Sequence, residues 1–597
     1  MAREKMSSVD TAWLHMDSTT NLMMIVGVMT FDTPLSLARL KTLLEGRLLV
    51  YPRFRQYVVD DGMTAHWVDD DKFDLDAHVR RVRLPGAGGE RELQSMVADL
   101  ASERLDKGKP LWQMHVIENY NGGSALITRI HHCIADGIAL IGVLLNMTDE
   151  DPNAPDTPRV HPALGKSKVK KFNKGASSPT SILSALGPIG EQLQGMLAPA
   201  MQALAPVAGV AQQAFDQLGP LKAPIENALE TAMDEGARIG STVVAKYNRW
   251  VDNPAEAMDT AKMVGGFAQE LAFLATMPND TPTQLKGKPG TVKCVAWSEP
   301  ISLERVKDVG YVLGCSVNDV LLASVAGAIR GYLVDHGDAV APDALLRAFV
   351  PVNLRPPGKE YKLGNQFGLV GLELPIGEAN PVARVFEVRR RMNGLKNGYL
   401  AAVSMALLGV VGYLPKAVQR QALGLFSDKG TAVMTNVPGP AKPLYLAGSK
   451  IVQNMFWVPQ SGNVGVGVSI LSYAGGVQFG LITDRKLCPD PEDIIRRFEP
   501  EFDKLITSLM WCENGYVGAD ARAFDAMLNA GGADANAVAP APCHASRRKR
   551  QSRVRAQNEL PDCAHGRFSF LLKCPSGKGT GFGLRKSRVL VFRRFAL

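Results

Sequence analysis

Strand-like and helix-like apolar segments alternate in two separate parts of this chain, residues 22–147 and 291–510. In the first part, LMMIVGVMTF (Leu22–Phe31) is typical of a strand, and LSLARLKTLLEGRLLVYP (Leu35–Pro52) has apolar residues at helical spacing and ends at a proline. In the second part, KCVAWSEPIS predicts a strand and SVNDVLLASVAGAIRGYLVDHG (Ser316–Gly337) a helix. A chain of 597 residues is also too long for one ordinary core. We therefore predict an α/β (α+β) protein with two domains.

The composition shifts between these parts and again after them. Residues 150–178 are rich in Pro, Lys and Ser, as linkers are, and residues 180–280 combine Ala, Gln, Met and Leu with interspersed prolines. The second stretch predicts broken amphipathic helices, which either cover a groove or lipid surface or act as a plain connector. We divide the chain into a first domain at 1–150, a linker and helical connector at 151–285, a second domain at 286–512 and a low-complexity tail at 513–597.

The net charge of +8 belongs to the tail and not to the two domains. Residues 541–597 hold 14 of the 67 Lys and Arg residues and 2 of the 59 Asp and Glu residues, which leaves 53 basic against 57 acidic residues elsewhere. Runs such as RRKRQSRVR bind nucleic acid or anionic lipid in some proteins and are solvated, disordered tails more often. We expect a disordered tail and no nucleic-acid partner.

Cysteine usage and apolar run lengths indicate a cytoplasmic protein. The eight cysteines are scattered without C-x-x-C spacing, which favours reduced thiols and argues against a zinc ribbon. The start MAREKMSSVD has charges with no apolar core behind them, so no secretory signal is expected. The longest apolar run, Leu400–Leu414, is shorter than the ~20 residues of a spanning helix. The protein is expected to touch a membrane without crossing it.

Two adjacent histidines stand in the segment RIHHCIADG, at the end of a predicted strand. SALITRIHH (Ser124–His132) predicts that strand, and GIALIGVLLNM (Gly137–Met147) predicts a buried helix after it. Successive side chains of a strand point to opposite faces, so His131 and His132 diverge and are poorly placed to bind one metal ion together. We expect no metal site here.

Asp136 and Gly137 explain how such a histidine is held. Asp136 is suited to be the N-cap of the helix that starts at Gly137, and a glycine permits close approach by another backbone or a ligand. A general base must be neutral, fixed in tautomer and partly open, which a strand end on a tight turn allows. The alternative is a pair of hydrogen-bonded structural histidines, and we favour catalysis.

The motif and several segments around it resemble one family of acyltransferases. HHCIADG matches the HHxxxDG motif of the coenzyme A-dependent acyltransferase superfamily. Further segments are similar, in the right order, to those of bacterial wax ester synthase/diacylglycerol acyltransferases: SSVDTAWLHMDSTTNLMMI, FDLDAHVRRVRLP, KPLWQMHVIE, VNDVLLASVAGAIRGYL, PVNLRP, LGNQFG and TNVPGP. The resemblance covers about residues 6–510. HHxxxDG alone gives the superfamily, whereas the ordered set is specific to the family.

The resemblance implies a fold, substrates and roles. The fold would be two chloramphenicol-acetyltransferase-like domains with a channel between them. The substrates would be a long-chain acyl-CoA and either diacylglycerol or a fatty alcohol, without a cofactor. His132 would be the general base, His131 a supporting residue, and Asp136 the residue that orients the turn. Such an enzyme is expected at the inner face of the plasma membrane or on lipid inclusions, peripherally bound.

Further positions have a structural and a functional interpretation. Asn318 and Asp319 either cap a helix or close the channel and help hold substrate, and we weigh these equally. Asn436 and Gly439 mark a tight turn that lines the acyl site or is purely structural, with the structural role slightly favoured. Gly137 is a candidate channel residue because it adjoins the histidine turn.

Three other functional classes remain as alternatives. A peptide-synthetase condensation domain shares HHxxxDG but needs a phosphopantetheine carrier partner. A non-catalytic lipid-binding protein would depend on the helical middle and the basic tail. Nucleic-acid binding depends on the tail alone. The glycine-rich segments GNVGVGVSILSYAGG and GKGTGFG lack the context or spacing of nucleotide-binding loops.

Overall fold

The computed structural model describes residues 3–62, 64–159, 277–355, 362–396, 400–412, 416, 419 and 427–513. All of these belong to one compact unit, Met1–Phe524. Residues 180–276 of the predicted connector helices and the tail from residue 514 onward lie outside the described residues.

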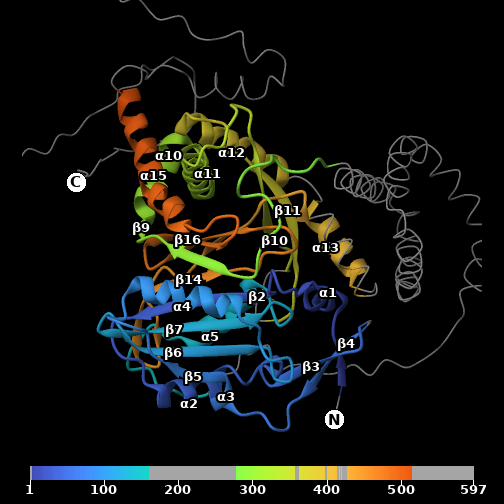
Figure 1. Ribbon diagram of the computed structural model, residues 1–597. Coiled ribbons are helices and arrows are strands. Elements are labelled where there is room, and N and C mark those ends of the chain that lie inside the picture. The colour runs from blue at the N-terminus through green and yellow to red at the C-terminus, as the bar shows by residue number, and fades with distance from the viewer. Residues whose placement is uncertain are drawn as a thin grey trace, which may run out of the picture. The chain divides into compact units, whose positions relative to one another are not determined.

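The first large sheet combines strands from both ends of the chain (Figure 1). Its order is β13 (Tyr445–Leu446), β14 (Ser449–Trp457), β2 (Met24–Phe31), β7 (Gly123–His131), β6 (Trp112–Tyr120) and β5 (Val79–Val82). Neighbours are antiparallel except the parallel pair β5 and β6. The central strand β2 is buried along its whole length, which explains its predominantly apolar sequence. Two strands of the predicted second domain thus complete the sheet of the first.

The second large sheet comes from the later part of the chain. Its order is β11 (Phe367–Leu374), β10 (Leu346–Asn353), β12 (Ala432–Pro438), β15 (Val466–Tyr473), β16 (Gly476–Asp484) and β8 (Lys293–Trp297), with β9 (Ile301–Ser302) also on β16. The parallel strands β10 and β12 pair at two positions, whereas β12 and β15 pair at seven. These two described strands, β10 and β12, therefore separate beyond Phe349 and Val433.

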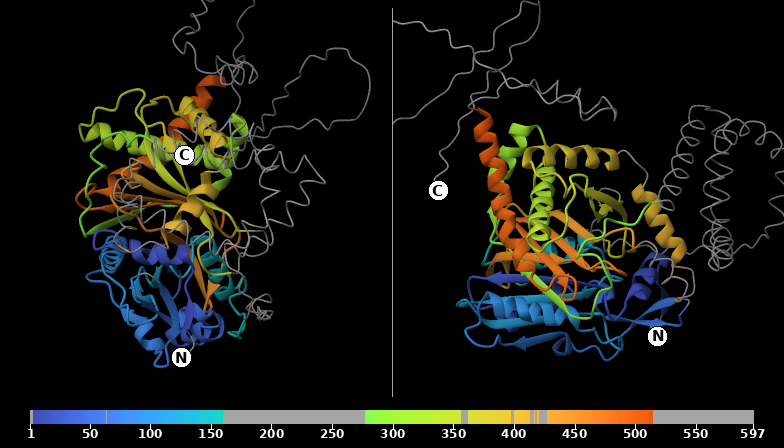
Figure 2. Two further views of the ribbon diagram at one scale, coloured as in Figure 1. Left: turned by 90° about the vertical axis from the view of Figure 1, so that its right-hand side faces the viewer. Right: turned by 45° about the horizontal axis from the view of Figure 1, so that its top comes forward.

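A small third sheet and the helices complete the described structure. The sheet has the order β1 (Arg3–Lys5), β4 (Ala65–Asp69) and β3 (Gln56–Asp60). The helices are α1 (Ser8–Met16), α2 (Leu37–Arg47), the 3-10 turn η1 (Pro52–Phe54), α3 (Leu75–His78), α4 (Glu90–Ser102), α5 (Gly137–Met147), α10 (Leu303–Leu313), α11 (Val317–Asp335), α12 (Pro381–Lys396), α13 (Leu400–Val411) and α15 (Pro491–Glu513). Helices α10, α12 and α15 pack around α11 beside the second sheet (Figures 1 and 2).

Local sequence accounts well for the bounds of two helices. The side chain of Asp136 accepts a hydrogen bond from Ala139 N at 3.0 Å, so α5 begins at Gly137 as predicted. Helix α11 begins with a capping box between Ser316 and Asp319. Among the described residues, α11 is the one helix with the length and apolarity of a membrane span, and 72% of its apolar window is buried. That burial is typical of a core helix.

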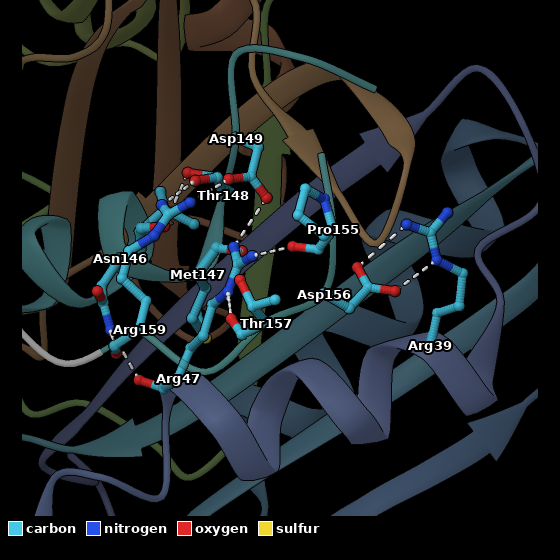
Figure 3. Close-up of polar contacts among 11 residues, drawn as sticks. Arg39, Arg47, Asn146, Met147, Thr148, Asp149, Pro155, Asp156, Thr157 and Arg159 are labelled. Atoms are coloured by element: carbon cyan, nitrogen blue, oxygen red, sulfur yellow. Dashed lines mark hydrogen bonds and ion pairs between the residues drawn. The ribbon is translucent and has the colours of Figure 1, made fainter. Parts of the chain in front are cut away.

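The segment after α5, where a linker is predicted, is bound tightly to α2 up to residue 159 (Figure 3). The side chain of Arg47 is fully buried, and its guanidinium donates to the Asp149 carboxylate at 2.8 Å and to Thr157 O at 3.1 Å. Arg39 donates two further hydrogen bonds to Asp156. Polar contacts made by α2 therefore fix the chain that leaves the first sheet.

Candidate functional site

A cavity of about 790 Å³ lies between elements of the two large sheets, and it contains the HHxxxDG turn. This volume is in the range of small-molecule sites, roughly 300–1,000 Å³. Its walls are mainly apolar, and its lining includes Trp13, His132, Asp136, Gly137, Lys307, Asn318, Phe349, Val350, Pro351, Asn353, Phe367, Thr435, Asn436, Val437, Gly439 and Phe456. The cavity therefore suits a ligand that is largely hydrocarbon with a few polar groups.

His132 follows β7 directly and is held on several sides. Its backbone N donates to Met23 O at 2.7 Å. The ring stacks on Trp13, with centroids 4.3 Å apart and planes at 19°, and meets Phe367 at 5.6 Å. The ring nitrogen Nδ1 is fully enclosed, whereas His132 lines the cavity, so Nε2 is the nitrogen that can meet a ligand.

Burial keeps the His132 imidazole neutral. The side chain is 3% exposed, and burial lowers the pKa of His132 to about 4. The nearby Asp136 charge, its own backbone and the Asn365 side chain act in the opposite direction and are weaker. A neutral imidazole with one nitrogen facing a cavity can accept a proton at pH 7.

His131 faces away from this cavity, as the strand alternation predicts. Its Nδ1 accepts a hydrogen bond from Cys133 N at 3.2 Å, and its backbone N donates to Leu111 O. Burial lowers the pKa of His131 to about 4 as well. In the part of the chain that the structure describes, the one grouping able to hold a metal ion is His336 with Asp490 and Asp493, and it includes neither motif histidine.

Asp136 is buried, and both oxygens of its carboxylate accept hydrogen bonds. Besides capping α5, its carboxylate accepts from Arg355 Nη1, 2.7 Å from both oxygens, and from Gln366 N at 3.0 Å. These contacts orient the turn between His132 and α5. Sequence reasoning missed Arg355, although it stands inside the matching segment PVNLRP.

A second missed connection links His132 to α1. Asn365, in the segment LGNQFG, donates from Nδ2 to His132 O at 2.8 Å and to Asp10 Oδ1 at 2.7 Å. Burial raises the pKa of Asp10, while Ser7 and Asn365 lower it through hydrogen bonds. Both residues lie in segments that carry the family resemblance, which was the available signal.

The remaining candidate positions divide between wall and cap. Asn318, Asn436 and Gly439 line the cavity, and Asn436 Nδ2 donates to Asn318 Oδ1 at 2.6 Å. Asp319 is buried and accepts from Ser316 N at 2.9 Å within the capping box, away from the lining. The structure thus places Asp319 in a cap and Asn318 on the cavity wall.

Two glycines shape this region by lacking a side chain. A Cβ on Gly439 would lie 2.2 Å from Ser472 O, so the two backbones could not approach as they do. Gly137 borders both the main cavity and a second apolar cavity of about 90 Å³ beneath α5. Gly439 and Phe456 also line both cavities, so these residues separate two adjoining spaces.

Comparison with known proteins identifies the family. The family model described as wax ester synthase/diacylglycerol acyltransferase catalytic domain matches residues 6–234, and that of the WS/DGAT C-terminal domain matches residues 363–506. Two probable diacylglycerol O-acyltransferases of Mycobacterium tuberculosis are 26% and 28% identical, over 74% and 76% of this chain and 81% and 87% of theirs.

A solved structure shares the fold. The wax ester synthase/diacylglycerol acyltransferase from Marinobacter aquaeolei VT8 superposes with a TM-score of 0.55 and 20% sequence identity, over 85% of this chain and 99% of that one. The α/β fold class predicted from the sequence is confirmed. Both halves of the chain match the family in order, and the HHxxxDG turn lies in the first matched region. The chain therefore belongs to the wax ester synthase/diacylglycerol acyltransferase family of acyltransferases.

Proposed function

We propose that this protein transfers a long-chain fatty acyl group from acyl-CoA to diacylglycerol and to long-chain fatty alcohols, with His132 as general base. The observation that carries the proposal is a neutral, fixed histidine facing a mainly apolar cavity between the two sheets. The names of the Mycobacterium tuberculosis relatives support diacylglycerol as an acceptor. The family name supports fatty alcohols as well.

The reaction is a direct transfer without a covalent enzyme intermediate. His132 Nε2 accepts the proton of the acceptor hydroxyl as its oxygen attacks the thioester carbonyl. The tetrahedral oxyanion then collapses, the carbon–sulfur bond breaks, and the imidazolium returns the proton to the departing CoA sulfur. A well-placed base contributes roughly 10²–10⁴-fold to such a step, so alignment of both substrates must supply much of the remaining acceleration.

The surrounding residues would act by positioning the base. Trp13 stacks on the imidazole, and Asn365 holds the His132 carbonyl. Asp136, neutralised by Arg355, fixes the turn and the start of α5. His131 supports the strand end from the opposite face, where it accepts from Cys133 N. No cofactor or metal ion is part of the proposed chemistry.

The proposed acceptors are lipids, which concentrate in membranes and in lipid inclusions. We therefore propose that the enzyme works in the cytoplasm while bound peripherally to the inner face of the plasma membrane or to an inclusion surface. Co-sedimentation with diacylglycerol-containing vesicles tests this part. Protein that turns over dispersed substrate but never sediments with such vesicles would contradict it.

The enzymatic proposal is tested by following CoA release from palmitoyl-CoA with hexadecanol or dipalmitoylglycerol. The wild type should release CoA with either acceptor, and His132→Ala should lose roughly 10²–10⁴-fold in kcat. His131→Ala, equally buried but outside the cavity, tests the supporting role and should lower the kcat of its folded fraction far less than His132→Ala does. An active His132→Ala beside an inactive His131→Ala would reverse the assignment.

The same assay separates the other classes of protein. A condensation enzyme would acylate an aminoacyl group on a carrier protein and would leave hexadecanol and dipalmitoylglycerol unreacted. A non-catalytic lipid-binding protein would bind vesicles and release no CoA. Deletion of residues 516–597 should leave acyl transfer unchanged if the tail has no part in the reaction.

A further inference from the structure

Two asparagine side chains form a hydrogen-bonded pair on the cavity wall. Asn436, on β12, donates from Nδ2 to Oδ1 of Asn318, in the first turn of α11, at 2.6 Å. Both side chains line the cavity and are half-buried. This bond leaves the Nδ2 donor of Asn318 and the Oδ1 acceptor of Asn436 without another partner among the described residues. The pair therefore offers a ligand the two N–H donors of the Asn318 amide and the carbonyl oxygen of the Asn436 amide.

One substrate of the proposed reaction matches this pattern better than the other. The pantetheine arm of acyl-CoA carries two secondary amides, and each has one N–H donor and one C=O acceptor. Diacylglycerol and fatty alcohols have no amide, and the mechanism places their single hydroxyl at His132. A buried amide is favourable when both its groups are hydrogen-bonded and costly when they are not.

Strands β10 and β12 of the second large sheet separate beside the Asn318–Asn436 pair. Strands β10 and β12 pair only at Ala348↔Ala432 and Phe349↔Val433 within their described lengths, and then diverge. Residues of both strands beyond that point line the cavity, namely Val350, Pro351 and Asn353 on β10 and Thr435, Asn436 and Val437 on β12. A narrow, extended arm can lie in such an opening, which Asn436 borders.

A positive charge stands at an exposed part of the same cavity. Lys307, on α10, lines the cavity and is exposed, and its ammonium makes no ion pair or hydrogen bond within the described ranges. Among the described residues, Asp136 is the one other Asp, Glu, Lys or Arg side chain that lines the cavity, and it is already paired with Arg355. The phosphates of CoA lie at the end of the pantetheine arm remote from the thioester, so they would emerge where the cavity opens.

We propose that the Asn318–Asn436 pair binds the pantetheine arm of acyl-CoA and that Lys307 binds its phosphates. The donor thus enters along α10 and between β10 and β12, with its thioester at His132. This inference rests on the proposed function and adds to it the residues that select an amide-containing donor. With the donor on this path, the acceptor approaches His132 from the side of Trp13 and Phe367.

The test compares three donors that differ stepwise in these groups. Palmitoyl-CoA has the amides and the phosphates, S-palmitoyl-pantetheine has the amides alone, and S-ethyl thiopalmitate has neither. Asn318→Leu and Asn436→Leu should raise KM by about tenfold for the first two donors and leave the third unchanged, as expected for loss of one hydrogen bond. Lys307→Gln should raise KM for palmitoyl-CoA alone, and KM for hexadecanol should stay constant throughout.

Matched variants outside the cavity control for general damage. Asn463→Leu removes a half-buried amide that also donates one hydrogen bond, to Asp428, and Lys72→Gln removes an exposed lysine of the first half. Neither borders the cavity, so neither should change KM for any donor. Unchanged turnover of S-ethyl thiopalmitate by the Asn318 and Asn436 variants shows that their fold and base are intact.

Three outcomes overturn the inference. One is a rise in KM that is equal for all three donors, and another is a rise confined to the acceptor. The third needs no variant: wild-type enzyme that binds S-ethyl thiopalmitate as tightly as S-palmitoyl-pantetheine has no amide recognition. A wild type that releases no CoA from palmitoyl-CoA would instead refute the proposed function, so the two failures are distinguishable.

Discussion

Arg355 and Asp136 lie 219 residues apart, yet Arg355 Nη1 is 2.7 Å from both carboxylate oxygens of Asp136, in a fully buried pair. The arginine comes from the segment that follows β10, and the aspartate caps α5 immediately after the histidine turn. This ion pair therefore ties the turn that carries His132 to the later half of the chain.

Breaking this pair should destabilise the protein and impair the reaction together. Arg355→Met leaves the Asp136 carboxylate buried without its cationic partner, which typically costs about 3–5 kcal/mol. Urea unfolding measures this loss, and kcat should also fall because the turn is no longer fixed. Arg39→Ala removes a partly exposed ion pair with Asp156 and should cost about 1 kcal/mol or less. Equal losses from both variants would contradict the role given to Arg355.

Trp13 should matter for catalysis through the orientation of the His132 ring. Trp13→Phe keeps an aromatic face against the imidazole and should change kcat by less than about threefold, because most of the stacking contact remains. Trp13→Ala removes the contact and should lower kcat by about 10–100-fold, in addition to losing about 3–5 kcal/mol of stability. Trp67→Ala, at an equally buried tryptophan on β4 outside the cavity, should lose stability and keep kcat.

Activity should persist to lower pH than for an ordinary histidine base. The pKa of His132 is lowered to about 4 by burial, so the neutral, proton-accepting form is present from pH 7 down to that value. The acid limb of kcat/KM, which reports the free enzyme, should therefore have its midpoint well below 6.5. A midpoint at or above 6.5 would show that His132 is less buried in solution or is not the base.

The same shift makes the fold sensitive to acid. His115, His131 and His132 all have pKa values lowered to about 4 by burial, below the ordinary value near 6.5. Between pH 4 and pH 6.5 the unfolded state binds more protons than the folded state. The contribution of these histidines to the free energy of unfolding is therefore fully present above pH 6.5 and is lost as the pH drops toward 4. His115→Leu, remote from the cavity, should reduce this pH dependence while the kcat profile stays unchanged.

The size of residue 137 should set the acyl chain length. A Cβ on Gly137 would lie 3.7 Å from Phe456 Cε2, an ordinary contact, so Gly137→Ala should fold and react normally. Gly137→Leu would place a larger side chain between the main cavity and the smaller one and should favour octanoyl-CoA over palmitoyl-CoA by about tenfold, which corresponds to about two fewer buried methylenes at about 0.8 kcal/mol each. Gly394→Leu, with open space around its Cβ, is the control. An unchanged preference in Gly137→Leu would exclude this route for the chain.

Arg47 should hold the chain segment after α5 without affecting chemistry. Arg47→Met leaves several carbonyl groups without their donor and leaves the Asp149 carboxylate with Arg159 as its remaining cationic partner, which should cost about 3 kcal/mol and expose residues 148–159 to protease. Limited proteolysis with mass spectrometry locates the new cuts. Lys442→Gln, which removes an exposed pair with Glu150, should leave the cleavage pattern as in the wild type.

The sequence by itself determined the local design around His132. A strand of alternating faces sends His131 and His132 in different directions, and Asp136 caps the helix that begins at Gly137. These features depend on backbone geometry and on hydrogen bonds between residues three positions apart, so a short segment contains all the information.

Tertiary structure alone decided which side chains surround that histidine. Trp13, Asn365 and Arg355 reach the turn from distant segments, and β14 joins the first sheet from the later half of the chain. The separation of β10 from β12 opens the second sheet beside Asn436, although both strands have ordinary strand sequences. Such contacts depend on how whole sheets pack against each other and on how long loops bring distant segments together. No local pattern of residues encodes that packing.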